Sequence, residues 1–319
     1  MNTFKWGFVG AGMIAKKALY PAISKSSVGE IYAVASRDAD RAMTISPKGL
    51  IYTDYDQMFA DPAVDGVYIS LPNAFHLPTA IKAMKAGKHV LCEKPLGMNA
   101  AEVREAIEVS EKMGVLFVEA SWNRWHPRTQ RVHEIVRSGK LGAIKRIRTA
   151  FTYSGLDDAN IRLDPTIGGG ILYDLGPYST VAPLWLLDFP AVSDLAVQSV
   201  RHPGGVDETT RVNYTLGNTV CETVTSCNIP ETSWLIVEGE KGVARMLGDN
   251  VFNSRHADSK LEVTIDGKVS IEHFGPVDPY QIMADNFARK AMGGSDWVMP
   301  LSQSLRFAQL FDAAFAQMK

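Results

Sequence analysis

Lys94 is the residue of this chain best placed to exchange a proton with a small molecule. It follows the short apolar run 90–92 and Glu93, and it precedes Pro95. The run is too short for a helix and indicates the last part of a buried strand, which Pro95 ends because proline cannot donate to a sheet ladder. At the carboxyl end of a strand in an open parallel sheet, the amine faces the ligand crevice. There it can position a reacting hydroxyl; the alternative is a surface lysine in a salt bridge.

Tyr178 and Asp174 are the second candidate pair. They follow the glycine run 168–170 and are four positions apart, so they share one face if the segment is a helix. Glycines before a helix allow the backbone to approach another surface closely. A phenol near a lysine cation can have its pKa lowered and so transfer a proton at neutral pH. The alternative is structural, with Tyr178 as a core aromatic and Asp174 as a solvated helix residue.

A glycine-rich turn near the amino terminus predicts dinucleotide binding. The pattern G-x-G-x-x-A occupies residues 10–15, between a strand expected at 5–9 and a helix. The first glycine allows the tight turn, the second lets the backbone approach a pyrophosphate, and the alanine lets the helix pack on the strand. The alternative is simply a tight strand–helix turn. The positions expected to contact the cofactor are Gly10, Gly12, Met13 and Ile14.

The residues after the second expected strand, 31–35, bear on the choice of cofactor. A fold selective for NAD usually places a carboxylate there for the ribose 2′-hydroxyl. This chain has Ser36 and Arg37, with Arg41 following. A carboxylate would repel a 2′-phosphate, whereas an arginine fork pairs with it. These residues therefore favour NADP, while Asp38, one position late, keeps NAD open.

Another strand, expected at 66–71, ends beside the same crevice. It is followed by Asn73 and His76, and then by a helix expected at 78–86. The alternative makes Asn73 a turn former and His76 a helix-start cap. The cofactor-binding positions expected from this strand end and from the lysine strand are Leu71, Pro72, Asn73, His76, Glu93 and Lys94.

The sequence pattern predicts that the candidate residues are carried by two domains. Strands and helices alternate over residues 1–121, which predicts an α/β Rossmann domain with a doubly wound parallel sheet. From about residue 144 the apolar period becomes two, which predicts an open, mainly antiparallel β-sheet of five or six strands. Residues 122–319 are therefore expected to form an α+β domain, which would be the one for substrate binding and oligomerisation. Its closing helices, expected at 279–292 and 303–317, pack back on the first domain.

Composition excludes several classes of function. The 319 residues include 33 Lys and Arg against 35 Asp and Glu, so there is no electrostatic footprint for nucleic acid or an anionic membrane. The three cysteines form no CxxC pattern, and a reducing cytoplasm is the expected location. The sequence shows neither a signal peptide nor an apolar run of about 20 residues. No metal site is expected.

Several of these motifs resemble the glucose–fructose oxidoreductase / inositol dehydrogenase (Gfo/Idh/MocA) family. They are the glycine turn at 10–15, the Leu-Pro-Asn-x-x-His run at 71–76, the stretch 86–95 that ends in Glu-Lys-Pro, and 168–170 with 174–176. The resemblance implies a Rossmann domain followed by an open sheet that often mediates dimer or tetramer contacts. It also implies hydride transfer between nicotinamide and a carbinol carbon, usually of a sugar or cyclic polyol.

The resemblance also assigns roles to single residues. It implies that Lys94 contacts the reacting oxygen. At the position that matches Tyr178 the family often has histidine. A tyrosine there resembles the glucose–fructose oxidoreductase, dimeric dihydrodiol dehydrogenase and sugar-ketoreductase branches, which are largely NADP-linked. The absence of a histidine beside Asp174 argues against inositol-dehydrogenase chemistry. By the same analogy, Arg162 and Tyr280 approach the nicotinamide end.

The resulting hypothesis is an NADP-dependent oxidoreductase acting on a secondary alcohol or ketone of a sugar or cyclic diol. Tyr178 would take the hydroxyl proton, Lys94 would polarise the oxygen, and Asp174 would bind the substrate or orient Lys94. A homodimer or homotetramer would form through the carboxyl-terminal sheet. The alternatives are a sensor that binds NAD(P) or a sugar without turnover, and a glycosidase that uses nicotinamide transiently.

Overall fold

The computed structural model describes residues 3–248 and 251–318. The chain forms two compact units: Met1–Trp122 with Asp278–Ala308, and Asn123–Val277 with Gln309–Lys319. The expected domain boundary after residue 121 lies one residue before the first crossing between them. The second crossing precedes α9 (Pro279–Ala291), and the third lies within α10 (Leu301–Gln317).

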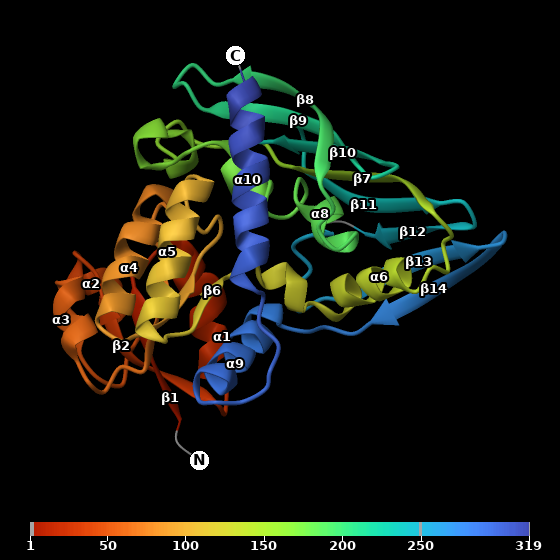
Figure 1. Cartoon of the computed structure of the whole chain (residues 1–319). Coiled ribbons are helices and arrows are strands. Elements are labelled where there is room, and N and C mark those ends of the chain that lie inside the picture. Colours follow the sequence, from red (N-terminus) through yellow and green to blue (C-terminus); the bar gives the residue numbers. More distant parts are fainter. Residues whose placement is uncertain (1–2, 249–250, 319) are drawn as a thin grey trace. The chain divides into compact units, whose positions relative to one another are not determined.

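The first unit is built on a parallel sheet of six strands, coloured red to yellow in Figure 1. Its order, β3-β2-β1-β4-β5-β6, reverses direction between β1 and β4, which is the switch point where such sheets bind ligands. This confirms the doubly wound architecture expected from the alternation of strands and helices. The strands are β1 (Phe4–Val9), β2 (Gly29–Ala35), β3 (Ile51–Tyr52), β4 (Gly66–Ile69), β5 (His89–Cys92) and β6 (Phe117–Glu119).

Helices cover both faces of this sheet because both faces are apolar. On one face, α4 (His76–Lys85) and α5 (Ala100–Met113) lie side by side (Figure 1) and pack with α3 (Tyr55–Ala60) on strand residues such as Val67 and Val90. On the other face lie α1 (Tyr20–Ser24) and α9, whose Phe287 contacts the rings of Phe4 and Trp6. The short helix α2 (Ala39–Met43) follows β2.

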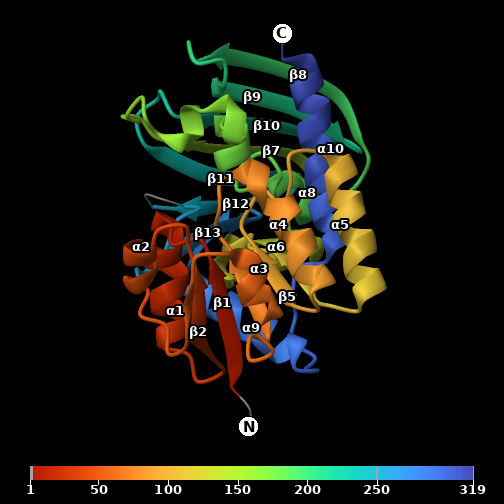
Figure 2. The same ribbon diagram turned by 90° about the vertical axis from the view of Figure 1, so that its left-hand side faces the viewer.

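The second unit contains an open sheet of eight strands, in the order β14-β13-β12-β11-β7-β10-β9-β8. The part from β13 to β8 can be followed in Figure 2. Only β7 and β10 are parallel neighbours; the other pairs are antiparallel. The strands are β7 (Ile144–Thr152), β8 (Val192–Arg201), β9 (Asp207–Leu216), β10 (Thr219–Ser226), β11 (Thr232–Gly239), β12 (Gly242–Leu247), β13 (Ser259–Ile265) and β14 (Lys268–Phe274).

The predicted number of five or six strands is therefore wrong, and β12 and β14 are the strands that were missed. β12 is a short strand that begins at a glycine and carries Arg245, which pairs with Glu262 on the neighbouring strand. β14 is an edge strand with mostly exposed side chains. β12 buries Ala244 and Met246, and β14 leaves Val269 and Ile271 exposed. Alternating patterns this short give less signal than the longer runs of the predicted strands.

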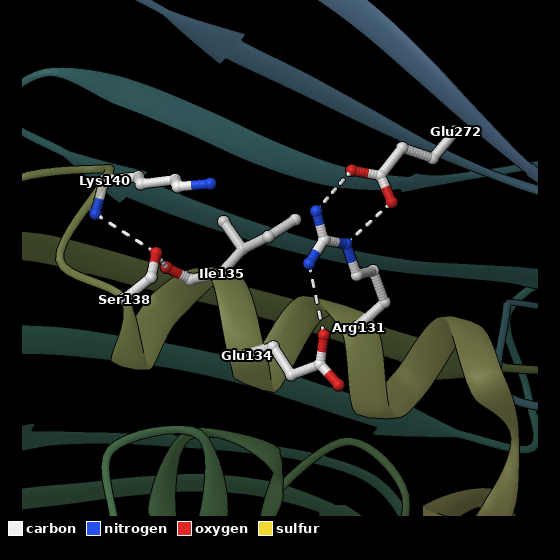
Figure 3. Close-up of polar contacts among 6 residues, drawn as sticks. All are labelled: Arg131, Glu134, Ile135, Ser138, Lys140 and Glu272. Atoms are coloured by element: carbon white, nitrogen blue, oxygen red, sulfur yellow. Dashed lines mark hydrogen bonds and ion pairs between the residues drawn. The ribbon is translucent and has the colours of Figure 1, made fainter.

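One face of the sheet is buried beneath α6 (Pro127–Arg137), α7 (Ile171–Leu175) and α8 (Ala182–Leu186). Arg131 of α6 binds Glu272 of β14 through Nε at 2.7 Å and Nη2 at 3.0 Å, and it also reaches Glu134 (Figure 3). Farther along the helix, the Ser138 hydroxyl donates to the carbonyl of Ile135 (Figure 3). The two-pronged ion pair fixes α6 to the edge of the sheet.

Candidate active site

The glycine turn of the first unit is tight and lies close to the end of β4. Gly10 has φ of +87°, and its N–H donates to the Ala35 carbonyl at 2.9 Å. A Cβ built on Gly10 would lie 3.0 Å from Leu71 Cδ2, and one on Gly12 would lie 3.4 Å from the Ser70 carbonyl oxygen. The turn therefore packs against the end of β4, where a side chain at Gly10 would crowd Leu71 and would also strain the backbone at positive φ.

The segment after this turn presents Met13 to solvent, with 57% of its surface exposed, while Ala15 is fully buried. The helix begins with a π-helical turn at Ala15–Leu19 and continues as α1. Ile14 is half-buried. The alanine thus packs as the motif predicts.

The end of β2 carries the residues expected to choose between the cofactors. Ser36 is buried and its hydroxyl accepts the N–H of Asp38, while Arg37 and Arg41 are exposed. The Asp38 carboxylate caps α2 by accepting the Arg41 backbone N–H at 3.0 Å. The carboxylate nearest this strand end in sequence is therefore already used in holding the local turn.

His76 lies inside the first unit and joins two strand ends. Its Nδ1 is 2.8 Å from the Pro95 carbonyl oxygen, and its Nε2 is 2.8 Å from that of Leu71. Burial lowers the pKa of His76, the positive charge of Lys94 lowers it further, and the two carbonyls oppose this. The ring therefore ties the Leu71–Asn73 segment to the residue after Lys94. Pro72 precedes a short 3-10 segment at Asn73–Phe75.

Lys94 stands at the carboxyl end of β5 beside buried acidic groups. The Glu93 carboxylate accepts the Tyr68 hydroxyl at 2.7 Å and the Lys94 backbone N–H at 3.3 Å. Glu119, at the end of β6, is buried next to Glu93 and Lys94. Burial raises the pKa of Glu119 to about 7, against the Ser304 hydroxyl and the Leu96 backbone, which lower it.

Glu119 and Tyr68 were missed in the sequence because both lie within apolar strands. Only their register beside β5 reveals that they surround the lysine strand end: Tyr68 pairs with Leu91, and Glu119 pairs with Cys92. Tyr280, at the start of α9, is buried and stacks on Trp122 with ring centroids 4.9 Å apart.

The second unit gathers Arg162, Asp174 and Tyr153. Asp174 Oδ2 accepts Arg162 Nε at 2.7 Å and the Tyr153 hydroxyl at 3.0 Å. The side chains of Asp174 and Arg162 are 13% and 31% exposed. Burial, followed by the charge of Asp174, raises the pKa of Tyr153 above its usual range. Asp174 is thus an ion-paired residue, not a solvated one.

Tyr178 does not lie on the same helix as Asp174, because α7 ends at Leu175. Pro177 has no N–H to continue the ladder, so the chain passes into turns in which the Tyr178 N–H donates to the Leu175 carbonyl at 3.0 Å. Tyr178 nonetheless lies close enough to Arg162 to raise the pKa of that guanidinium. Its ring packs edge-on against Phe151, with centroids 5.6 Å apart.

The predicted residues thus fall into two sets. Lys94, Glu93, His76 and the glycine turn belong to the first unit, and the Arg162–Asp174–Tyr178 group belongs to the second. A shared cavity for Lys94 and Tyr178 stays a prediction.

Two protein-family models match the two halves of this chain. The "Oxidoreductase family, NAD-binding Rossmann fold" model of Gfo/Idh/MocA matches residues 4–121, and the "GFO/IDH/MocA C-terminal domain" model matches 129–245. The chain belongs to the Gfo/Idh/MocA family. It is an NAD(P)-binding oxidoreductase whose first unit is the nucleotide-binding domain.

Relatives match this Gfo/Idh/MocA protein over most of its length. D-xylose 1-dehydrogenase (NADP(+)) 2 of Haloferax volcanii is 33% identical, over 97% of this chain and 96% of its own. Trans-1,2-dihydrobenzene-1,2-diol dehydrogenase of Mus musculus is 34% identical, over 76% of this chain and 74% of its own.

The fold of this chain is also that of a solved enzyme structure. The 3-ketoreductase of Actinomadura kijaniata, in complex with NADP and TDP-benzene, superposes with a TM-score of 0.91 at 24% identity. The match covers 100% of this chain and 98% of that one. Within the part of the chain that the structure describes, no helix is both long and apolar enough to cross a membrane.

Proposed function

We propose that this oxidoreductase transfers hydride between NADP and a secondary alcohol or ketone of a sugar or cyclic diol. The observation that carries the proposal is Lys94, an amine at the carboxyl end of a strand in a nucleotide-binding sheet, beside the buried carboxyl groups of Glu93 and Glu119. The carboxyl ends of β1 and β5 lie on the same edge of that sheet, where open α/β sheets bind their ligands, and this supports a common crevice for the amine and the glycine turn.

Tyr178 is the proposed proton-transfer group, with Lys94 on the same oxygen. In oxidation the phenolate form of Tyr178 takes the hydroxyl proton while Lys94 stabilises the negative charge on the oxygen, and in reduction both steps reverse. The nicotinamide, when bound, accepts or supplies the hydride. Asp174 binds the substrate or orients Lys94, and Arg162 and Tyr280 approach the nicotinamide end.

A related enzyme supports the pairing of these two residues. The Actinomadura ketoreductase was also solved with one lysine changed to alanine and with one tyrosine changed to phenylalanine. These two positions are as far apart in its sequence as Lys94 and Tyr178 are in this chain.

The preference for NADP rests on the end of β2. Arg37 and Arg41 are exposed there, where a guanidinium can pair with a 2′-phosphate. Asp38 is engaged as the cap of α2, so it is poorly placed to bind a ribose hydroxyl in the manner of an NAD-selective enzyme. The Haloferax relative is named as an NADP(+) enzyme and the ketoreductase was solved with NADP.

The open sheet of the second unit supports assembly into a homodimer or homotetramer. Its outer face combines apolar side chains such as Val220 with charges that are already paired, among them Arg148 with Glu238 and Arg245 with Glu262. A surface with paired charges loses less solvation when it is covered by a second copy. The three buried, unpaired cysteines accord with a cytoplasmic location.

A substrate screen tests the function directly. The purified protein is mixed with NADP or NADPH and a panel of sugars, keto-sugars and cyclic diols, and cofactor absorbance and products are followed together. Formation or consumption of NADPH that matches substrate turnover supports the proposal. Release of a sugar without net NADPH indicates a glycosidase, and cofactor binding with no turnover on any compound indicates a sensor; either result overturns it.

A further inference from the structure

Asp207 is a buried carboxylate that touches the helix carrying Asp174. It is the first residue of β9 and only 4% of its surface is exposed. Its Oδ2 accepts the backbone N–H of Leu172 at 2.9 Å and the hydroxyl of Thr210 at 2.7 Å. Leu172 is the second residue of α7, so the contact joins the start of that helix to the sheet.

This contact supplies a cap that α7 cannot supply itself. The residue before the helix is Gly170, which has no side chain, and no local side chain caps the helix. The first N–H groups of any helix lack intrahelical partners, and in a helix of five residues they are a large share of the total. The carboxylate from a strand 35 positions away takes the place of the missing local cap.

The glycine run 168–170 is shaped around this carboxylate. A Cβ built on Gly170 would lie 2.5 Å from Asp207 Oδ1, and Gly170 has φ of +127°. At Gly169 a Cβ would lie 2.7 Å from the Arg162 carbonyl oxygen. The glycines therefore admit Asp207 on one side and the Arg162 segment on the other. The sequence predicts that this glycine run lets the backbone approach another surface closely. The surfaces it approaches, Asp207 and the Arg162 segment, belong to the second unit.

We infer that Asp207 is a positioning residue that fixes α7 against the sheet and thereby sets the places of Asp174 and Tyr178. The inference rests on the proposed function. The mechanical connection is short: the Asp174 N–H donates to the Gly170 carbonyl, and the Tyr178 N–H donates to Leu175 at the end of the same helix. A shift at the start of α7 is therefore passed to both side chains.

Hydrogen exchange tests the contact without relying on activity. In Asp207→Ala, exchange is expected to become faster in peptides covering 171–178, while the part of β9 from residue 212 onward stays protected. Asp207→Asn keeps a side-chain oxygen that can accept the Leu172 N–H, so it is expected to restore much of the protection. Thr210→Val is the control that removes the other hydrogen bond of the same oxygen. Unchanged exchange at 171–178 in Asp207→Ala overturns the inference, even if the protein shows no turnover on the substrate panel.

Kinetics with any substrate found in the panel give the second readout. Displacing a catalytic group by about 1 Å can cost on the order of 10²-fold in rate. We expect Asp207→Ala to lower kcat by roughly this factor while the Kd for NADPH, measured by fluorescence, stays unchanged. Asp207→Asn is expected to recover most of kcat. Equal kcat in wild type and Asp207→Ala, with only a lower melting temperature, overturns the positioning role.

Discussion

Arg162 Nε lies 2.7 Å from Asp174 Oδ2, and both residues of this ion pair belong to the second unit. The charge of Asp174 is the largest cause that raises the pKa of Arg162, and Tyr178 also contributes. The interaction is reciprocal: if the phenolate of Tyr178 stabilises the guanidinium, the guanidinium stabilises the phenolate. Arg162 therefore contributes positive charge near Tyr178 independently of Lys94, and the Asp174 carboxylate offsets part of it. This separates two roles that the sequence alone assigns to Lys94, which are to lower the pKa of the phenol and to bind the substrate oxygen.

Lys94→Met is expected to abolish most turnover while leaving cofactor affinity nearly intact. The loss of an acid–base or oxygen-polarising group typically costs about 10²- to 10⁴-fold in rate. Steady-state kinetics measure the loss, and quenching of protein fluorescence measures the Kd for NADPH. Lys85→Met, on the exposed side of α4, is the matched control. Near-normal turnover in Lys94→Met would refute the assignment of this residue.

Tyr178→Phe removes one hydroxyl and keeps the ring that packs against Phe151. We expect kcat to fall by about 10²-fold or more, and the limb of the pH–rate profile that reports the phenol to disappear. The profile of kcat/KM against pH is the deciding measurement. Tyr173→Phe is the control: it removes a hydroxyl from a neighbouring tyrosine, whose ring packs on Phe315. A Tyr178→Phe profile that follows the wild-type profile would count against proton transfer by Tyr178.

The sequence predicts the elements whose signals are local. The turn at Gly10 and the period of two in strands such as β9 follow from neighbouring residues alone, and both are confirmed. The end of α7 at Leu175 was missed, although Pro177 is a local signal for it. Tyr153 and Asp207 could not be found, because their roles arise from pairing across distances of 21 and 35 positions.

Replacing Ser36 with Asp and Arg37 with Ala is expected to shift cofactor preference toward NAD. The change removes a guanidinium and adds a carboxylate at the end of β2, which repels a 2′-phosphate. A hydrogen bond to a charged group contributes about 1.5–3 kcal/mol, so affinity for NADP should fall by about 10- to 100-fold. Kd values for both cofactors provide the measurement, with Arg104→Ala on the exposed side of α5 as control. If both cofactors bind the double variant as they bind wild type, the 2′-phosphate argument is wrong.

Glu119 should make stability fall as pH rises toward neutrality. Burial raises its folded-state pKa from 4.5 to about 7, so between these values the folded chain holds a proton that the unfolded chain releases. The free energy of unfolding therefore decreases across this window and is constant, for this group, above and below it. A shift of this size corresponds to about 3 kcal/mol, because one pKa unit equals about 1.36 kcal/mol.

Glu119→Gln isolates this contribution because glutamine carries no titrating proton. Denaturant unfolding at several pH values between 5 and 8 gives the difference in free energy between variant and wild type, in which the other titrating groups largely cancel. We expect this difference to move in favour of the variant as pH rises, by up to about 3 kcal/mol. Glu108→Gln, at an exposed position of α5, measures the effect of losing a carboxylate at the surface. A difference that stays constant over this range would mean that Glu119 is ionised throughout, and the buried acid could not then be a neutral neighbour of Lys94.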